Sequence, residues 1–350
     1  MKNILFFIHN EYHVFVIISL IKEYYSDLSK YNVTVLHQIN PNDNRFEFEI
    51  KWEELGVEVI TIKASKLEIN KGEIVPKLEL ILQKNYYKYI SFLEGSPINW
   101  YLAEKLKNNG TIISVAPEGT KPYITISKAA LYSRFRATFE NYQYLRKNRL
   151  SLNSLNLISN KNGSLKQTDE VLINHPEFYQ NRTHKKVVPV RIHEEKSHLQ
   201  LASKMFDFNI FDHFKQVDGI LLYLNHWVVE FKIYDLEIEI LQRLKILYPE
   251  KEIYIKLHPN THKFQLERLK KIEGISLFYS TIPAEIFIGN IKNSIVFSFW
   301  SASLLINNPT CKFYWLYPMI AKNNIKMKWF SIVNPTQHIN SVEEIKNITF

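Results

Sequence analysis

The sequence predicts an α/β protein made of two lobes, each with a parallel sheet covered by helices. Short, continuous apolar runs alternate with amphipathic segments along most of the chain, which is typical of parallel strands buried on both faces. The length of 350 residues exceeds the usual size of one compact core and suits two domains. A hydrophobic content of 46% with 23% charged residues excludes a disordered or collagen-like chain.

The first lobe is predicted from a strand, turn and helix unit that begins the chain and then recurs. Residues 4–8 form a buried-strand run, and a helical pattern of apolar residues follows through Ile21 and Tyr25. We expect the other strands of this lobe at residues 33–36, 57–62, 89–92 and 111–115, with a helix at 99–107. The pattern loosens between residues 121 and 196, so we place the first lobe at residues 1–195.

The same alternation resumes in residues 196–350, which predicts a second, smaller Rossmann-like lobe. We expect its strands at residues 219–224, 252–257, 275–279, 294–299 and 312–316. We expect its helices at residues 229–247, 264–272, 283–291 and from Ser301 onward, and the last helix of the chain can pack back onto the first lobe. No Walker-type loop or dinucleotide-binding glycine pattern occurs in a chain with 9 glycines.

Composition limits the partners and the compartment. The formal charge of +9 favours anionic partners, such as phosphorylated substrates, anionic lipid or nucleic acid. The single cysteine, Cys311, excludes an internal disulfide framework and a cysteine-based zinc site. The apolar runs at residues 3–8 and 14–21 are too short to span a membrane, and their arrangement lacks the features of a secretory signal. We therefore expect a cytoplasmic protein.

Polar residues directly after strands are the candidate site residues, because ligands of open parallel sheets bind beyond the carboxyl ends of the strands. Glu118 and Gly119 follow the strand at residues 111–115. A carboxylate in this position suits a general base, and the glycine allows a substrate to approach the backbone closely. Glu94-Gly95 has the same form, and a turn or a helix cap is the alternative role for either glutamate.

A histidine follows the strand at residues 252–257. His258 precedes Pro259, which keeps the histidine extended. An imidazole at a strand end can stabilise or protonate a leaving phosphate. The alternative is a surface histidine in a turn, and the same dipeptide recurs at His175-Pro176.

Two further features lie later in the second lobe. Glu285 is in the first turn of the predicted helix at residues 283–291, where a carboxylate ordinarily complements the helix dipole. Ser301 and Ser303 begin the helix that follows the strand at residues 294–299. Hydroxyls and unpaired N–H groups at a helix start suit a phosphate, and simple capping is the alternative.

The order of these motifs resembles that of the bacterial GT-B sialyltransferases and polysialyltransferases. Those families carry an acidic-Gly motif in the first lobe, and a His-Pro motif followed by a serine or threonine motif in the second. The resemblance implies a GT-B fold, in which two Rossmann-like lobes face each other across a cleft. This chain departs from the family pattern in two places, because Pro-Glu-Gly replaces two acidic residues before the glycine and Ala302 separates the two serines.

The resemblance also implies roles for the motif residues. Glu118 resembles the catalytic base, His258 resembles the histidine that contacts the CMP phosphate, and Glu285 falls where the family binds the ribose. Contacts with the nucleotide or donor are implied for all the remaining motif residues: Gly119, Thr120, Lys256, Pro259, Ser301 and Ser303. Three residues shortly after predicted strands are further candidates for donor or acceptor contacts: Asn10, His13 and Asn225.

The implied activity is an inverting transfer of sialic acid or a related nonulosonic acid from its CMP-activated donor. The acceptor is a carbohydrate in surface polysaccharide or lipooligosaccharide synthesis. Such a transfer needs a base for the acceptor proton, stabilisation of an oxocarbenium-like centre and neutralisation of a departing phosphate. We expect no metal and no other cofactor. The sequence has no Asp-x-Asp motif, and the acidic run from Asp235 to Glu239 has a helical pattern that predicts a solvated face.

Two other functions stay open. The first is a transferase of Kdo or of a CDP-linked polyol phosphate. Polyol-phosphate transferases also show a Lys-x-His-Pro motif, and they are expected to use a histidine base such as His9 or His13. A non-catalytic module would bind nucleic acid through the basic stretch from Arg134 to Arg149, but no nucleic-acid motif is present. We favour that stretch as a patch for an acceptor, which can be lipid-linked, or for the anionic surface of the inner membrane.

Overall fold

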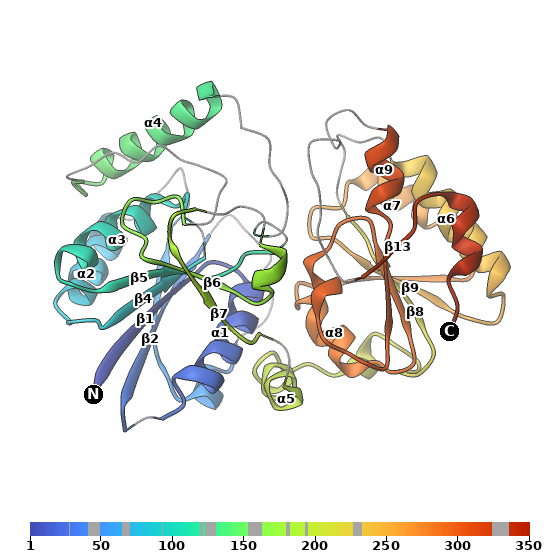
Figure 1. Cartoon of the computed structure of the whole chain (residues 1–350), viewed down its shortest axis with the longest axis horizontal. Coiled ribbons are helices and arrows are strands. Elements are labelled where there is room, and N and C mark those ends of the chain that lie inside the picture. The colour runs from blue at the N-terminus through green and yellow to red at the C-terminus, as the bar shows by residue number, and fades with distance from the viewer. Residues whose placement is uncertain are drawn as a thin grey trace. The chain divides into compact units, whose positions relative to one another are not determined.

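The structure is a computed structural model, and it describes residues 1–27, 29–40, 50–64, 71–92, 94–119, 122, 131–152, 163–179, 183–192, 195–226, 233–323 and 336–350. The described chain divides into two compact units. The first unit ends at Ile192, a few residues before the expected boundary, and the second takes up the chain after it, including residues 336–350. Both units are α/β structures (Figure 1).

The first unit is built on a parallel sheet with the strand order β3-β2-β1-β4-β5-β6-β7. Its strands are β1 (Lys2–Ile8), β2 (Tyr31–Ile39), β3 (Glu58–Lys63), β4 (Lys88–Ser91), β5 (Ile112–Val115), β6 (Glu170–Ile173) and β7 (Lys186–Pro189). The central strands carry apolar side chains on both faces, and residues 4–8 of β1 are fully buried. β7 is a partly exposed edge strand that ends in proline, which has no N–H to offer a further strand.

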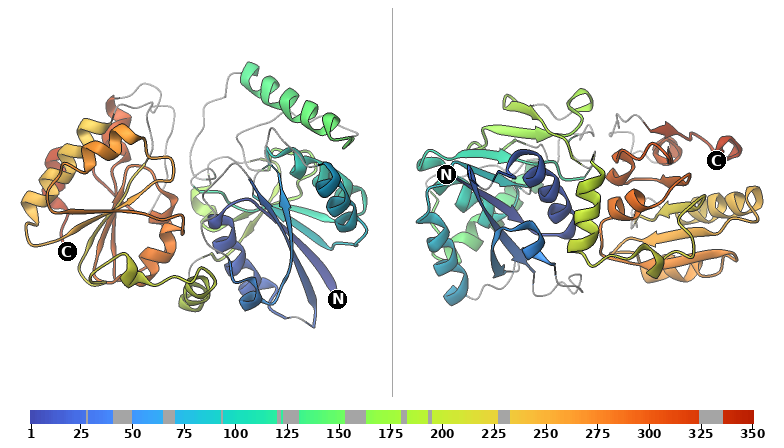
Figure 2. Two further views of the ribbon diagram at one scale, coloured as in Figure 1. Left: turned by 180° about the vertical axis from the view of Figure 1, so that it is seen from behind. Right: turned by 90° about the horizontal axis from the view of Figure 1, so that it is seen from below.

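Helices cover both faces of this sheet (Figure 2). They are α1 (Glu11–Tyr24), α2 (Lys71–Leu82), α3 (Pro97–Asn108) and α4 (Leu131–Lys147). On the α1 side, Tyr25 packs edge-on against Phe6 of β1. On the other side, apolar residues of α2 and α3 form one core with Leu5 and Phe7 of the same strand. The two faces of β1 are thus buried by different helices, and α4 packs on α3.

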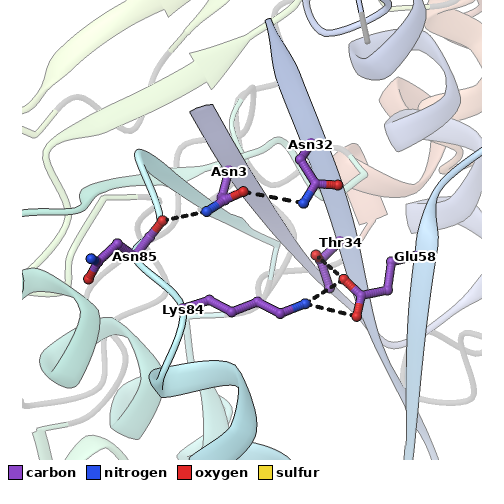
Figure 3. Close-up of polar contacts among 6 residues, drawn as sticks. All are labelled: Asn3, Asn32, Thr34, Glu58, Lys84 and Asn85. Atoms are coloured by element: carbon purple, nitrogen blue, oxygen red, sulfur yellow. Dashed lines mark hydrogen bonds and ion pairs between the residues drawn. The ribbon is translucent and has the colours of Figure 1, made fainter. Parts of the chain in front are cut away.

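Polar side chains near the amino-terminal ends of the strands tie neighbouring segments together (Figure 3). Glu58 on β3 accepts two hydrogen bonds from the Lys84 ammonium, at 2.6 and 2.8 Å, and one from the Thr34 hydroxyl on β2 at 2.8 Å. The Asn3 amide on β1 donates to the Asn85 carbonyl at 2.8 Å. These side chains bond to one another, so this edge of the sheet is structural, and the candidate site residues follow the opposite ends of the strands.

The second unit is built on a parallel sheet with the strand order β10-β9-β8-β11-β12-β13. Its strands are β8 (Leu221–Leu224), β9 (Ile253–Leu257), β10 (Ile275–Tyr279), β11 (Ile295–Ser298), β12 (Lys312–Trp315) and β13 (Gln337–His338). Its helices are α5 (Lys196–Met205), α6 (Tyr234–Leu247), α7 (Lys263–Leu269), α8 (Ala284–Asn290) and α9 (Tyr317–Asn323). Every residue of β8, β9 and β11 is buried, as expected for a sheet covered on both faces.

Two contacts of the second unit involve its first and last segments. α5 packs on α8 at Gly289, where a Cβ atom would lie 2.7 Å from the methyl groups of Leu199, so only glycine allows this approach. The 3-10 helix η8 (Val342–Asn347) packs on α6, and the Tyr248 hydroxyl donates to the Ile348 carbonyl. The final turn thus packs on α6 of its own unit.

Each strand predicted from the sequence is present, with bounds shifted by a few residues at most. The sheet of the first unit is larger than predicted, because β6 and β7 lie in the stretch where the pattern loosens. β6 begins with Glu170, whose carboxylate pairs with Lys88 at 2.7 Å and Lys186 at 2.9 Å. These lysines, together with the Ser114 hydroxyl at 3.2 Å, compensate the buried carboxylate. Local periodicity does not show such partners, because they come from other strands.

Candidate functional site

The candidate residues of the first unit meet at one edge of its sheet. β1, β4 and β5 are neighbours in that order and run parallel. Residues that follow these strands therefore lie at the same edge. Asn10 and His13 come after β1, and Glu118 comes after β5. The structure thus brings the acidic-Gly motif next to residues from the beginning of the chain.

The His13 imidazole is held in one orientation by its neighbours. Asn10 caps α1, and its Oδ1 accepts a hydrogen bond from the His13 backbone N–H at 2.9 Å. The His9 backbone N–H donates to His13 Nδ1 at 3.2 Å. The ring stacks on Phe92 with the centroids 4.2 Å apart and 12° between the planes. Because Nδ1 accepts a hydrogen bond, the neutral ring carries its proton on Nε2.

His13 presents this Nε2 to Glu118. The distance from His13 Nε2 to Glu118 Oε1 is 3.7 Å, and Asn10 Nδ2 lies 3.4 Å from the same nitrogen. The Glu118 side chain is 27% exposed, whereas His13 is buried. Gly119 follows with φ at 56°, a conformation that residues with a Cβ rarely adopt. A small molecule can therefore reach the carboxylate, while the imidazole contacts it from the protein interior.

Two more histidines near this pair are uncharged at neutral pH. Burial, reinforced by the nearby His13, lowers the pKa of His9 to about 3 and that of His37 on β2 to about 4. Neither ring therefore adds positive charge beside Glu118. His9 was predicted only as an alternative base, and nothing was predicted for His37. The available signal was its position directly after the predicted strand at residues 33–36.

Glu94, the other glutamate before a glycine, has a structural role. Its buried carboxylate accepts hydrogen bonds from the Ser164 backbone N–H at 3.1 Å and from the Thr168 hydroxyl at 2.8 Å. Burial raises the pKa of Glu94. The carboxylate thus anchors the segment before β6 to the end of β4, and of the two glutamates Glu118 is the accessible one. Thr120 lies outside the described residues.

A second set of candidate residues meets at the carboxyl edge of the second sheet. β9, β8 and β11 are neighbours in that order, and they are followed by His258, Asn225 and Ser301 respectively. In the turn around Pro259, His258 Nδ1 accepts a hydrogen bond from the Asn260 backbone N–H at 3.1 Å. The neutral His258 ring therefore carries its proton on Nε2, which can be donated to a ligand.

Asn225 connects the end of β8 to the turn that carries His258. Its Oδ1 accepts hydrogen bonds from the His258 backbone N–H at 3.4 Å and from the Thr261 hydroxyl at 2.7 Å. Its Nδ2 donates to Glu237 Oε1 at 2.7 Å. Asn225 was predicted as a donor or acceptor contact, and the structure gives its amide a role in positioning His258.

Glu237 is buried, so the solvated face predicted for the acidic run of α6 is wrong at this position. Its carboxylate also accepts hydrogen bonds from the Tyr223 hydroxyl at 2.7 Å and from Gln265 Nε2 at 2.8 Å. Burial raises the pKa of Glu237. The sequence contained a signal, because Glu237 is spaced four and seven residues from Leu241 and Leu244 on the buried face of the helix.

Aromatic rings lie close to His258. The His226 centroid is 5.7 Å from that of His258 and 6.4 Å from that of Trp300, and Trp300 lies 5.3 Å from Tyr317. Burial lowers the pKa of His226 to about 4. These uncharged, flat rings at a strand edge can stack against a nucleobase or a sugar.

Three other residues predicted to bind the nucleotide are buried and bonded within the protein. Lys256 on β9 donates to the Ser280 carbonyl at 2.7 Å, and its Nζ lies 5.5 Å from the centre of the Phe287 ring. Glu285 accepts a hydrogen bond from the Ser303 hydroxyl at 2.9 Å, and burial raises its pKa. A ligand would have to replace these bonds to contact the three side chains.

The helix predicted to begin at Ser301 is present as a short 3-10 helix. Ser301 caps the 3-10 helix η6 (Ala302–Leu305), and its Oγ accepts a hydrogen bond from the Ser303 backbone N–H at 3.3 Å. The turn ends at Leu305, and Pro309 disfavours a helical conformation at Asn308. The Asn308 side chain donates to a carbonyl of α8 at 2.7 Å. A ligand at Ser301 and Ser303 would therefore contact a single short helical turn.

The two edges are suited to different chemistry. The first holds a partly exposed carboxylate beside an imidazole that donates from Nε2, which suits removal of a proton from a hydroxyl group. The second holds a half-buried histidine with a proton on Nε2 among aromatic rings, which suits a phosphate attached to a flat base. In the part of the chain that the structure describes, no three His, Cys, Asp or Glu side chains are grouped so as to bind one metal ion.

No protein-family profile and no curated protein sequence matches this chain. Solved structures do match. UDP-GlcNAc 2-epimerase from Neisseria meningitidis, bound to UDP-GlcNAc, has a TM-score of 0.57 at 10% identity, with 99% of this chain and 90% of that chain covered. The GT-B domain of a sialyltransferase from Photobacterium damselae has a TM-score of 0.54 at 12% identity, with 94% and 96% covered.

A third structure is similar to the same degree. The 2,6-sialyltransferase from Photobacterium sp. JT-ISH-224, in a complex with CMP and lactose, has a TM-score of 0.53 at 8% identity, with 96% of this chain and 78% of that chain covered. The likeness extends over nearly the whole chain in all three. Together with the two parallel α/β units, it shows that this chain has the GT-B fold.

Proposed function

We propose that the chain is an inverting glycosyltransferase that moves sialic acid or a related nonulosonic acid from its CMP-activated donor to a carbohydrate acceptor. The observation that carries this proposal is the pair of Glu118 and His13 at the carboxyl edge of the first sheet. An accessible carboxylate beside an imidazole that already carries its proton on Nε2 is suited to take a proton from an acceptor hydroxyl. The fold shared with two sialyltransferases supports this class of reaction.

In the proposed reaction the two units supply different groups. Glu118 removes the proton of the acceptor hydroxyl as its oxygen attacks the anomeric carbon of the donor. The bond between that carbon and the CMP phosphate oxygen breaks, and His258 donates from Nε2 to the departing phosphate. One of the structural neighbours was solved with CMP and lactose, which supports CMP and a carbohydrate as ligands here. The scheme assigns no step to a metal.

The hydrogen bond at His13 Nδ1 distinguishes this proposal from a histidine-base transferase. A CDP-polyol-phosphate transferase of teichoic-type polymer synthesis would be expected to use a histidine base in the first unit. The hydrogen bond from the His9 backbone N–H to His13 Nδ1 favours the tautomer with the proton on Nε2 over the longer 3.4 Å contact of Asn10 Nδ2 with that nitrogen. In this tautomer Nε2 has no lone pair to offer a hydroxyl group. Glu118 is therefore the favoured base, and a CMP-linked acid, Kdo included, is the favoured donor.

The first experiment asks which nucleotide the chain binds, because a UDP-GlcNAc 2-epimerase has the same fold. Thermal unfolding is compared in the presence of CMP, CDP, UDP and GDP. We expect CMP to raise the melting temperature most, since a ligand at a hundredfold excess over its Kd stabilises the folded state by about 2.7 kcal/mol. A larger shift with UDP than with CMP would refute the assignment of the donor.

The donor sugar is then tested with the CMP-linked forms of sialic, pseudaminic and legionaminic acid and Kdo, beside CDP-glycerol. Release of CMP in the presence of a mixed oligosaccharide acceptor is the readout. We expect turnover with one or more CMP-linked acids and none with CDP-glycerol. Turnover with CDP-glycerol alone would move the chain to the polyol-phosphate class.

A further inference from the structure

α4 is attached to the first unit by only one of its faces. Thr138 and Leu145 are buried on that face. Next to them, Asn141 donates a hydrogen bond from Nδ2 to the Gly95 carbonyl at 2.6 Å. The helix packs on α3 and lies at the outer edge of the unit (Figure 1). Several other side chains of the helix are exposed.

An aromatic stripe lies on the outer surface of this helix. Phe135, Phe139 and Tyr142 are spaced four and three residues apart, which places them on one face. Their exposed fractions are 57%, 59% and 37%. A helix of a globular protein normally turns such side chains towards the core, and an exposed aromatic cluster marks an interaction surface. We refer to Phe135, Phe139 and Tyr142 as the α4 stripe.

Positive charge surrounds the α4 stripe. Residues 131–149 contain five basic side chains, at positions 134, 136, 146, 147 and 149, against the single acid Glu140, a net charge of +4. Glu140 is already paired with Arg136, at 2.8 Å. Arg146 lies four residues after Tyr142 and seven after Phe139, so it shares the face of the stripe and is exposed. The surface therefore combines apolar rings with cations and suits an anionic partner.

We propose that α4 docks in the plane of an anionic lipid bilayer, with the α4 stripe at the level of the headgroups and the flanking arginines and lysine on lipid phosphates. Aromatic rings concentrate at membrane interfaces, and a helix with one apolar face edged by cations lies in that interface. No helix among the described residues is long and apolar enough to cross a membrane. The contact therefore lies along the surface of the bilayer. This proposal holds whichever sugar nucleotide the chain uses.

Flotation with lipid vesicles tests the proposal on the full chain. Vesicles of phosphatidylcholine alone are compared with vesicles that also contain phosphatidylglycerol, at low and high NaCl. We expect the chain to float with the anionic vesicles at low salt, and to stay in the soluble fraction with the neutral vesicles. The double variant Phe135→Ser/Phe139→Ser should lower the bound fraction roughly tenfold or more, because it removes both inserted rings.

The matched control is Phe211→Ser/Ile246→Ser, which removes two exposed apolar side chains from the second unit. We expect it to float like the unaltered chain. All of these side chains are exposed, so both double variants should keep the melting temperature of the unaltered chain. A second variant, Arg146→Gln/Lys147→Gln, should weaken flotation and reduce its dependence on salt.

Four results would overturn the proposal. The first is an unaltered chain that stays in the soluble fraction with anionic vesicles at low salt. The second is a Phe135→Ser/Phe139→Ser variant that floats like the unaltered chain. The third is light scattering that shows a lipid-free dimer which this variant converts to a monomer, because the stripe would then bind a second copy. Binding of an RNA or DNA oligonucleotide through the stripe, without flotation, would equally exclude a membrane.

Discussion

His13 Nε2 lies 3.7 Å from Glu118 Oε1, although His13 comes shortly after β1 and Glu118 shortly after β5. The contact exists because β1 and β5 flank β4 in a parallel sheet. It places a hydrogen-bond donor on the interior side of an accessible carboxylate. The order of the strands in the sheet therefore determines which side chain faces the Glu118 carboxylate.

Glu118→Gln removes the proposed base and keeps the shape of the side chain. We expect kcat to fall by roughly 10²-fold or more, because an amide cannot take the acceptor proton. The Kd of CMP, measured by calorimetry, should stay unchanged, since Glu118 is assigned to the acceptor. Glu94→Gln, at the same edge of the sheet, is the control, and its kcat should change little. Full activity in Glu118→Gln would show that another group is the base.

His258→Ala removes the proposed donor to the phosphate. We expect CMP binding to weaken by roughly tenfold or more, because a hydrogen bond to a charged group contributes about 1.5–3 kcal/mol. Calorimetric titration with CMP measures the change. The chain offers a matched control in the second His-Pro dipeptide, and His175→Ala should bind CMP as the unaltered chain does. Equal affinities for His258→Ala and the unaltered chain would place the nucleotide elsewhere.

Glu237→Ala should destabilise the second unit strongly. It leaves the buried donors of Tyr223, Asn225 and Gln265 without their shared acceptor. Each unsatisfied buried donor costs about 1–3 kcal/mol, so we expect the free energy of unfolding to fall by about 3 kcal/mol or more. Urea denaturation measures it. Glu239→Ala, two residues further along α6, removes only an exposed pair with Arg243 and should change stability by about 0.5 kcal/mol or less.

Glu237→Gln tests whether Glu237 fixes the orientation of Asn225 in addition to stabilising the fold. The amide keeps one acceptor oxygen in place of two, and its NH₂ group faces side chains that also donate. We expect Asn225 to lose its fixed orientation, so that the affinity for CMP falls while the fold is retained. A Glu237→Gln variant that binds CMP normally would show that the carboxylate serves stability alone.

Glu94→Ala tests whether this carboxylate is an anchor or a base. Removing it leaves the backbone N–H of Ser164 and the hydroxyl of Thr168 without their acceptor. We expect a loss of about 2–4 kcal/mol in the free energy of unfolding, with kcat per folded molecule little changed. A large loss of kcat with normal stability would contradict the structural role.

Stability should depend on pH through the buried histidine His37. Its pKa is lowered by burial, and then by His13, to about 4, whereas the unfolded chain takes up this proton near pH 6.5. Between these values the unfolded state binds more protons, so the free energy of unfolding falls as the pH falls. We expect the loss between pH 7.5 and pH 5 to be smaller in His37→Phe by about 1–2 kcal/mol.

Buried carboxylates act in the opposite direction and do not disturb this comparison. The pKa values of Glu94, Glu237 and Glu285 are raised by burial. Their contribution to stability is present at low pH and is lost as the pH rises through those values. They are the same in the unaltered chain and in His37→Phe, so the difference between the two reports the histidine. Identical losses in both proteins would mean that His37 titrates normally.

The sequence by itself determined the alternation of strands and helices, and with it two parallel sheets and the edge at which each site lies. These features depend on local apolar runs and on the residues directly after them, so Glu118, His258 and Asn225 could be placed at those edges from the sequence alone. The helix expected from Ser301 is a short 3-10 helix, Ala302–Leu305, and the apolar pattern did not predict its type or its end.

Only the tertiary structure decided which polar groups are accessible. Glu94 and Glu118 have the same sequence form, yet one is buried by donors from residues 163–168 and the other is partly exposed. Glu237 belongs to an acidic run, yet three donors from separate segments enclose it. The physical reason is that a carboxylate can be buried only where donors from elsewhere in the chain replace its water, and their arrival depends on the order of the strands.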